Sequence, residues 1–283
     1  MKVEYNFTTS STWNNSILLR YDLNKIIQID KLYFYNDNSL LKCQHFFDFE
    51  ITDLILNQVR EYINKSYIIK FSYINDLLSL KLENWANKNN YSFNLTDTWE
   101  APQLILKNYS IVDYLKNNNH AQIKRNYKYY ENKKGKYKFL NSNDSNVLKM
   151  WNDVLKIDYN SWKQEENSDM KSLNREDLQY LPFLLENKEK TSLIVIYDSN
   201  NNPLAYSLMF KNNDNYWYAV KWGASSEGRK LYSGIFCLFY HLEYLYSLNE
   251  ILKVDFWGRR NKTYEYLSNS FIKRCHIEIS KVV

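Results

Sequence analysis

A glycine-bearing segment, WGASSEGRKLYSGIF (Trp222–Phe236), holds the residues whose types and spacing point most clearly to chemistry. The chain has only five glycines among 283 residues, and Gly223, Gly228 and Gly234 all lie in this segment. A strand-like sequence precedes it and an apolar, helix-like sequence follows it. Backbone N–H groups at a helix start bind phosphate, because they lack carbonyl partners and lie at the positive end of the helix dipole. The segment therefore predicts an anion site.

The spacing of the glycines leaves a second interpretation open, in which they serve a turn. The segment contains neither the Gly-Lys-Ser/Thr of a Walker loop nor the Gly-x-Gly-x-x-Gly of a dinucleotide site. Arg229 and Lys230 add positive charge beside the glycines, which suits an anionic ligand. The net charge of +5 and pI near 8.8 agree with either interpretation and fall short of a dedicated nucleic-acid binder.

A basic segment from about residue 111 to 134 carries a second possible chemistry. Its stretches KRNYKYY and ENKKGKYK interleave lysine with tyrosine. Such a pattern can bind RNA or a nucleotide-linked substrate by charge and stacking. A solvated helix that links two halves of the chain explains the same pattern.

The elements expected to position the glycine segment are three strands before it and a helix after it. The strands are predicted at 192–198, 204–210 and 215–223, and Asn-Pro and Asn-Asp signals between them favour antiparallel hairpins. A short strand is expected at 252–258. His241, within the helix, is expected to be a hydrogen-bonded core residue. The apolar face of the helix comprises Ile235, Phe236, Leu238, Phe239, Leu242 and Leu245.

The first 110 or so residues also alternate strand-like and helix-like segments. Strands are predicted there at 31–36, 40–51, 66–74 and 102–108, and helices at 52–64 and 76–90. In the second half, further helices are predicted at 146–162 and about 175–187. Thr52 is expected to cap the helix at 52–64, with Leu54, Ile55, Val59 and Ile63 on its buried face. All glycines follow this half of the chain, so its turns must rely on Asn and Asp.

Composition indicates a folded protein in a reducing compartment. Hydrophobic residues make up 45% of the chain and aromatic residues 17%, which excludes disorder. The cysteines, Cys43, Cys237 and Cys275, are odd in number and far apart, without metal or disulfide spacing. The N-terminus lacks the apolar core of a signal peptide, and no run approaches the ~20 apolar residues of a membrane span. We expect a soluble, cytoplasmic protein without a metal.

The order of elements around the glycine segment resembles the core of the GNAT acyltransferases. There, the pyrophosphate of acyl-CoA binds at the loop before the central helix. Short motifs between about residues 102 and 267 are similar to the FemAB-like branch of that superfamily, in particular its CelD/BcsL-type acetyltransferase-like members. These motifs are SWK (161–163), NNPLAYSLMF (201–210), VKWG (220–223) followed by Gly234, VDFWG (254–258) and the basic HAQIKRNYKYY (120–130).

The resemblance implies an acyl-CoA site and a set of reacting groups. Acyl-CoA would be held by Val220, Arg229, Lys230, Tyr232, Ser233 and Gly234. Backbone N–H groups around Val220 and Lys221 would stabilise the oxyanion of a direct transfer. Tyr264 would be the general acid for the leaving thiolate, with packing as the alternative role. Asp255 would act as a base or, equally, as a structural hydrogen-bond acceptor.

The same resemblance implies an amine acceptor held by Trp162, Lys163 and Trp222, although Trp162 and Lys163 could simply end a helix. Ser233 stands where the family has proline, and Glu265 follows Tyr264 where lysine is usual. Two alternatives therefore accompany acyl transfer from acetyl-CoA or another acyl-CoA. One is a FemAB-like transferase that uses aminoacyl-tRNA, and the other is an inactive GNAT-fold binding module.

The sequence thus predicts an α+β protein of two tandem GNAT-like units, each a mixed, mainly antiparallel sheet flanked by helices. The expected divisions are a degenerate unit at 1–110, a basic connecting helix at 111–135 and an acyl-donor-binding unit at 136–283. The expected activity is N-acyl transfer, of groups other than aminoacyl, to a small-molecule or peptide amine bound between the two halves.

Overall fold

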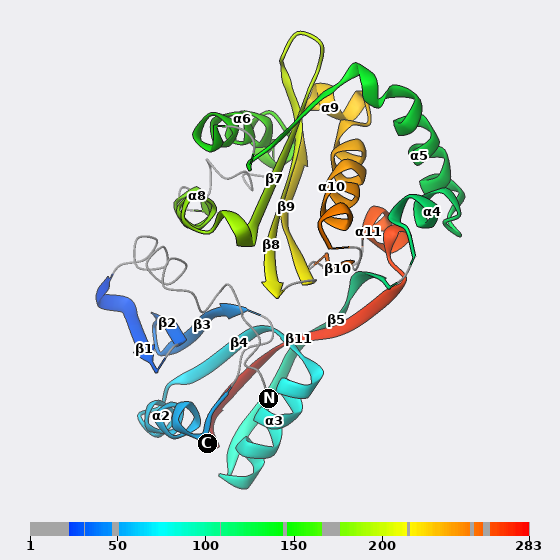
Figure 1. Cartoon of the computed structure of the whole chain (residues 1–283). Coiled ribbons are helices and arrows are strands. Elements are labelled where there is room, and N and C mark those ends of the chain that lie inside the picture. Colours follow the sequence, from blue (N-terminus) through cyan, green and yellow to red (C-terminus); the bar gives the residue numbers. More distant parts are fainter. Residues whose placement is uncertain are drawn as a thin grey trace. The chain divides into compact units, whose positions relative to one another are not determined.

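The structure, a computed structural model, describes residues 23–30, 32–46, 51–107, 109–143, 146–165, 176–213, 216–249, 252–256 and 261–282. The chain forms two compact units (Figure 1). One comprises Met1–Ala101 with Phe271–Val283, and the other comprises Pro102–Ser270. The boundary thus lies before the expected position at 110. The C-terminal strand returns to the first unit, because it pairs there with an earlier strand.

The first unit has a mixed sheet with two helices. Its strands follow the order β1 (Ile26–Ile29), β2 (Leu32–Asp37), β3 (Leu40–Phe46), β4 (Ile68–Asn75), β11 (Ser270–Lys281). The β3/β4 pair is parallel, and the β1/β2, β2/β3 and β4/β11 pairs are antiparallel. A 3-10 turn, η2 (Leu23–Lys25), precedes β1, and the helices are α2 (Asp53–Asn64) and α3 (Asp76–Lys88).

Local signals in this unit are mostly confirmed. Thr52 caps α2, accepting a hydrogen bond from the Ile55 amide at 3.3 Å. The buried face of α2 includes Ile55, Val59 and Ile63, as predicted, and also Leu56. Leu54 was predicted to be on this face but is exposed, so the prediction for that residue was wrong. Asn38 and Asn90 adopt left-handed conformations, as expected for turns without glycine.

The second unit contains the longer, mainly antiparallel sheet. Its strand order is β5 (Tyr91–Leu106), β10 (Leu252–Asp255), β9 (Tyr216–Ala224), β8 (Pro203–Asn213), β7 (Thr191–Tyr197), β6 (Lys138–Asn141). Between neighbours in this order, β9/β10 is the parallel pair and the others are antiparallel, and both expected hairpins, β7/β8 and β8/β9, are confirmed. Strand β5 begins well before the predicted 102 and passes from the first unit into the second.

Helices cover both faces of this sheet (Figure 1). On one face lie α6 (Val147–Tyr159) and α8 (Glu176–Glu186); on the other lie α4 (Ile111–Lys116), α5 (Ala121–Lys133) and α10 (Ser233–Asn249). Shorter helices are α7 (Trp162–Glu165), α9 (Ser226–Lys230) and α11 (Lys262–Leu267), with 3-10 turns η3 (Lys134–Lys136) and η4 (Lys188–Lys190). The expected apolar face of α10 packs in the core, where Phe236, Phe239 and Leu242 are fully buried.

The basic segment is not one continuous helix, which corrects the prediction for 111–134. It divides into α4 and α5 at a run of three asparagines, where Asn117 ends α4 and the side chain of Asn118 accepts a hydrogen bond from the His120 amide at 2.8 Å. Asparagine competes in this way with helical hydrogen bonding. The inner face of α5 packs firmly on α10, because Tyr127 and Tyr130 both donate to the carboxylate of Glu243. Burial raises the pKa of both phenols, so they remain donors.

Candidate functional site

A cavity of about 820 Å³ lies within the second unit, at the end of β9. Its walls come from α5, α11 and the turn between α9 and α10. The lining residues are Gln122, Ile123, Asn126, Lys163, Val220, Lys221, Trp222, Gly223, Ala224, Arg229, Tyr232, Gly234, Ile235, Lys262, Thr263 and Tyr266. The volume is in the range of small-molecule sites.

Among the residues that the structure describes, one edge of β9 has no partner strand along this cavity. Strand β10 pairs with β9 only at Tyr216–Tyr218, whereas β8 continues to pair with it as far as Ala224. Met209 faces Ala219 and Leu208 faces Lys221, so Val220 is an extra residue that forms a β-bulge. Bulges often occur next to functional sites, where they redirect the backbone. In the described part of the chain, no strand pairs with this edge beyond Tyr218.

The glycine segment forms more structure than the loop expected from its sequence. After β9 ends, Ser225 caps the short helix α9 by accepting a hydrogen bond from the Gly228 amide at 3.1 Å. The backbone then turns at Tyr232, whose φ is 60°, and α10 begins at Ser233. The first-turn N–H groups of a helix have no intrahelical acceptors, so the start of α10 presents donors beside the cavity.

The three glycines of this segment all permit close packing. An added Cβ would lie 2.2 Å from the Leu204 carbonyl oxygen at Gly228, 2.9 Å from the Tyr206 ring at Gly223 and 3.3 Å from the Trp222 indole at Gly234. None of the described glycines has a positive φ. Their concentration therefore reflects crowding around β9 and α10 rather than turn conformation.

The predicted acyl-CoA residues divide into two groups. Val220, Arg229, Tyr232 and Gly234 line the cavity. Lys230 and Ser233 are not among the lining residues: the Lys230 ammonium lies 3.4 Å from the Glu227 carboxylate on the exposed side of α9, and Ser233 is fully buried.

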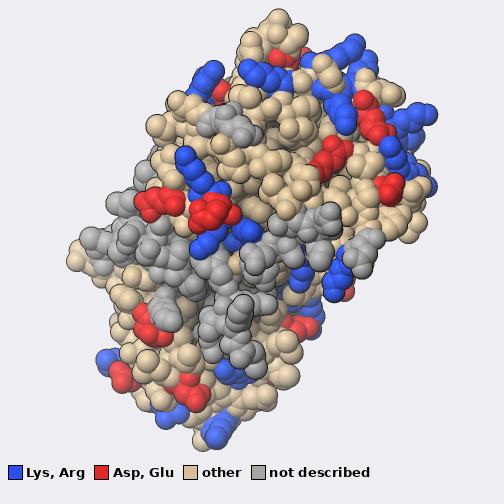
Figure 2. Space-filling view, viewed as in Figure 1, with Lys and Arg blue, Asp and Glu red and all other residues tan. Residues whose placement is uncertain are grey.

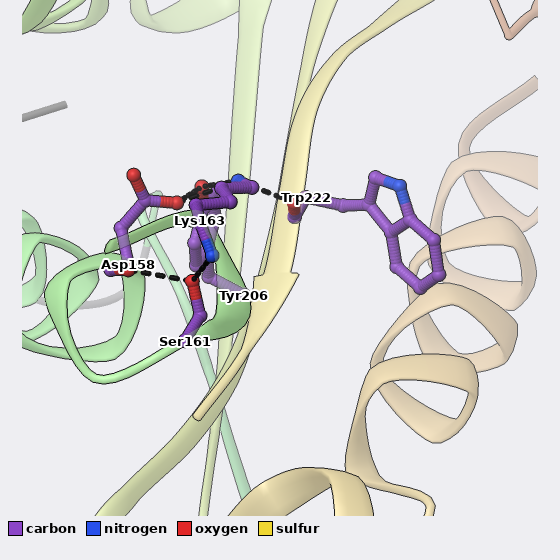
Figure 3. A network of polar contacts seen from close by, with 5 residues as sticks. All are labelled: Asp158, Ser161, Lys163, Tyr206 and Trp222. Atoms are coloured by element: carbon purple, nitrogen blue, oxygen red, sulfur yellow. Dashed lines mark hydrogen bonds and ion pairs between the residues drawn. The ribbon is translucent and has the colours of Figure 1, made fainter. Parts of the chain in front are cut away.

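The expected acceptor residue Lys163 lies at the centre of a buried polar network (Figure 3). Its ammonium donates to Asp158 Oδ1 at 2.6 Å, to Tyr206 Oη at 3.1 Å and to the carbonyl oxygen of Trp222 at 3.1 Å. Tyr206 also donates to Asp158 Oδ1, at 2.6 Å, and the Ser161 hydroxyl donates to the Asp158 carbonyl. The network joins α6 and α7 to β8 and to the open edge of β9. Lys163 therefore lines the cavity while its ammonium forms an ion pair with the carboxylate of Asp158.

Both the backbone carbonyl and the indole of Trp222 have defined contacts. Its carbonyl accepts the bond from Lys163, and its indole points the opposite way, toward α10, where it packs against Gly234 (Figure 3). The indole also lies 5.5 Å from the ring of Tyr264. Lys221, beside it, lines the cavity and has its ammonium 5.9 Å from the Tyr180 ring. The side chain of Trp162 lies outside the described residues.

The two predicted acid–base residues, Asp255 and Tyr264, are not among the residues that line the cavity. Asp255 is fully buried and accepts hydrogen bonds from Gln103 Nε2 at 3.1 Å and from the Tyr216 hydroxyl at 3.0 Å. Tyr264 stacks on Phe256 with ring centroids 4.6 Å apart, and burial raises the pKa of its phenol. These are the packing and hydrogen-bonding contacts that the sequence left open as alternative roles for the two residues.

The cavity favours anions. Lys221, Arg229 and Lys262 contribute cationic side chains, Lys163 is paired with Asp158, and no Asp or Glu occurs among the lining residues that the structure describes. Such a site attracts negatively charged ligands through an additive field. Together with the donors at the start of α10, this arrangement can hold phosphate groups and place a carbonyl beside the open edge of β9.

Sequence reasoning missed one wall of the cavity and part of the network. Gln122 and Asn126 lie within the HAQIKRNYKYY stretch but were not predicted as site residues, and Lys262 on α11 carried no motif. Asp158 had a weak signal, since it is a carboxylate five residues before Lys163 on the apolar side of a predicted helix. Contacts of this kind require the tertiary structure.

Comparison with known proteins supports the fold. No protein-family model matches the chain, and no curated protein matches its sequence. Among solved structures, FemX is similar over 97% of this chain and 92% of its own, with a TM-score of 0.65 and 10% identity. L-PGS from Bacillus licheniformis matches 89% of this chain and 81% of its own, at TM-score 0.62 and 10% identity. A tandem GNAT protein from the clavulanic acid biosynthesis pathway covers 88% and 78%, at TM-score 0.53 and 8% identity.

The chain has a GNAT-like fold. The predicted fold class, α+β with mixed, mainly antiparallel sheets and helices, is confirmed by the strand order and these neighbours. Across the described ranges, no helix has both the length and the apolar character needed to cross a bilayer.

Proposed function

We propose that the protein is an N-acyltransferase that moves an acyl group from acyl-CoA to an amine. The observation that supports it is the cavity itself, in which the described lining residues Lys221, Arg229 and Lys262 lie together with the edge of β9 beyond Tyr218 and the first turn of α10. The fold, shared with the tandem GNAT protein, agrees with a transferase of this kind.

The start of α10 and Arg229 would bind the pyrophosphate of the donor. Gly234 lines the cavity there, and the space that a side chain would take is filled by the Trp222 indole and Ala224. The thioester would then lie along Val220–Ala224, where N–H groups on the open edge of β9 can stabilise the developing oxyanion. The amine nitrogen attacks the acyl carbonyl carbon, the C–S bond breaks, and the thiolate takes up a proton as the amine loses one.

The reaction needs two proton transfers, one to the leaving thiolate and one from the attacking amine. Tyr264 stays the proposed general acid, since its ring lies 5.5 Å from the indole of Trp222, which lines the cavity. Its raised pKa keeps the phenol protonated, and packing is its competing role. Asp255 is better explained as the acceptor that orders Gln103 and Tyr216.

Calorimetric titration with CoA, acetyl-CoA and longer acyl-CoAs tests the proposal. We expect binding by the unaltered chain and a loss of about tenfold or more in the Gly234→Val variant, because the new side chain meets Trp222 and covers the α10 start. Gly135→Val is the matched control, since nothing lies within 4 Å of a Cβ at Gly135. Absence of binding by all these ligands would refute the acyl-CoA assignment.

An aminoacyl-tRNA donor is the second candidate. The exposed face of α5 carries Lys124, Arg125 and Lys128 beside the cavity wall, which is a surface suited to a polyanion. A transfer assay with charged tRNA tests this candidate, and transfer without any CoA binding would favour it over acyl-CoA.

A further inference from the structure

A second cavity, of about 390 Å³, lies within the second unit, and the described residues that line it all differ from those that line the cavity at β9. It lies where the residues that join α4 to α5 (117–120) meet those that join α11 to β11 (268–269), and we call it the asparagine cavity. Its volume falls within the range of small-molecule sites. It can therefore hold a ligand of its own.

The described lining of the asparagine cavity carries no Asp, Glu, Lys or Arg side chain, and four of its eight residues are asparagines. The surface around it is different. Figure 2 shows Lys and Arg side chains gathered at the upper right of the view, where α4 and α5 lie in Figure 1, and Lys116 forms an ion pair with Glu131 at 2.9 Å. An ion that left water for this cavity would find no opposite charge on the described lining. The cavity therefore favours a ligand that is polar but uncharged.

Part of the cavity wall is fixed by contacts within the chain. Asn118 is buried, and its Oδ1 accepts a hydrogen bond from the His120 amide at 2.8 Å. Asn269 Oδ1 accepts from the Ile105 amide at 2.9 Å, and Asn269 Nδ2 donates to the Ile105 carbonyl at 2.8 Å. The imidazole of His120 stacks on the ring of Tyr266, with centroids 4.4 Å apart and planes at 19°. These contacts set the shape of the cavity without a ligand.

Other polar groups of the cavity are left available. The side-chain amides of Asn117 and Asn119 and the hydroxyl of Tyr109 make no hydrogen bond to another residue that the structure describes. Asn117 and Asn119 are exposed, and Tyr109 is 46% exposed, so its ring is accessible as well as its hydroxyl. The cavity therefore offers two amides and one aromatic ring to a ligand.

We propose that the asparagine cavity binds a neutral sugar. A sugar hydroxyl both donates and accepts hydrogen bonds, and a side-chain amide does the same through its NH₂ and C=O groups, so Asn117 and Asn119 can each bind a pair of adjacent hydroxyls. The apolar C–H face of a sugar ring packs on an aromatic ring such as that of Tyr109. The inference goes beyond the proposed acyl transfer, because the two cavities are lined by different residues.

Imidazole NMR signals give a local readout and an internal control. His120 lines the asparagine cavity, whereas His241 is fully buried on α10. The probes are the methyl glycosides of glucose, galactose, mannose and N-acetylglucosamine, with glucuronate and glucose 6-phosphate as charged comparators. We expect at least one neutral glycoside to shift the His120 signal saturably while the His241 signal stays unchanged. The proposal is overturned if none does so up to about 50 mM, or if a charged comparator binds more tightly than every neutral glycoside.

Variants then locate the bound sugar. Asn119→Ala should weaken binding of that glycoside about tenfold, because the hydrogen bonds of one amide are lost. Asn94→Ala is the matched control, since Asn94 is also exposed and does not line the cavity. Tyr109→Ala should weaken binding as well, whereas Tyr109→Phe keeps the ring and should retain most of the affinity. An unchanged His241 signal shows that each variant is folded. Equal affinities of Asn119→Ala and Asn94→Ala, or equal losses in the two Tyr109 variants, would contradict the proposed sugar site.

Discussion

Replacing Lys163 by methionine should strongly destabilise the second unit. The pair with Asp158 is buried, since the side chains are 13% and 1% exposed, and the ammonium supplies three of the hydrogen bonds in Figure 3. Methionine keeps the length of the stem but removes the positive charge and the bond that the ammonium donates to the buried carboxylate. Breaking a buried ion pair from one side costs about 3–5 kcal/mol.

Urea denaturation of three variants measures this cost. Lys156→Met is the control, because Lys156 also pairs with an aspartate of α6, at 3.1 Å, but is 66% exposed. We expect that variant to lose less than about 1 kcal/mol. The double variant Lys163→Met/Asp158→Asn should recover part of the loss, since it removes the uncompensated charge. A cost for Lys163→Met no larger than that of Lys156→Met would refute the buried-pair argument.

Three further predictions concern crowding, buried histidine and proton transfer. Gly228→Ala should cost about 1–3 kcal/mol in urea denaturation, because its Cβ meets the Leu204 backbone, whereas Gly135→Ala should be neutral; equal effects would contradict the packing explanation. Burial lowers the pKa of His241 to about 3, so the folded state binds fewer protons than the unfolded state below pH 6.5. Stability should then fall by up to roughly 1.4 kcal/mol per pH unit from pH 6.5 toward 3, and His241→Asn should flatten this slope. Tyr264→Phe should reduce acyl transfer in a stopped assay with an identified amine; unaltered turnover would leave Tyr264 a packing residue only.

Much of the local structure follows from the sequence. Thr52 and its helix, the hairpins before Trp222 and the apolar face of α10 were all predictable, because capping, turn preference and periodicity act between neighbours in the chain. His241 was likewise expected to be a satisfied core residue, and it is hydrogen-bonded to Ser207 and Ser192 at 2.8 and 2.9 Å.

Other predictions failed where local signals competed. The basic segment has helical composition throughout, yet the asparagines at 117–119 divide it, because the Asn118 side chain hydrogen-bonds to the nearby backbone. The glycines of the segment after β9 predicted a loop, whereas Ser225 caps the short helix α9 there. The position of one side chain, Leu54, was misassigned because periodicity alone does not tell which edge of an apolar face meets the core.

The sequence by itself predicted an anion site, through the glycines and cations around the start of α10, and that site stays a prediction. Only the tertiary structure decided what those glycines do, since the atoms that crowd them belong to Leu204, Tyr206 and Trp222. It also brought Asp158 and Lys163 to the edge of β9, placed α5 as a cavity wall and buried Asp255 away from the site. These contacts join residues far apart in the chain, and their geometry is set by how sheets and helices pack rather than by any local pattern.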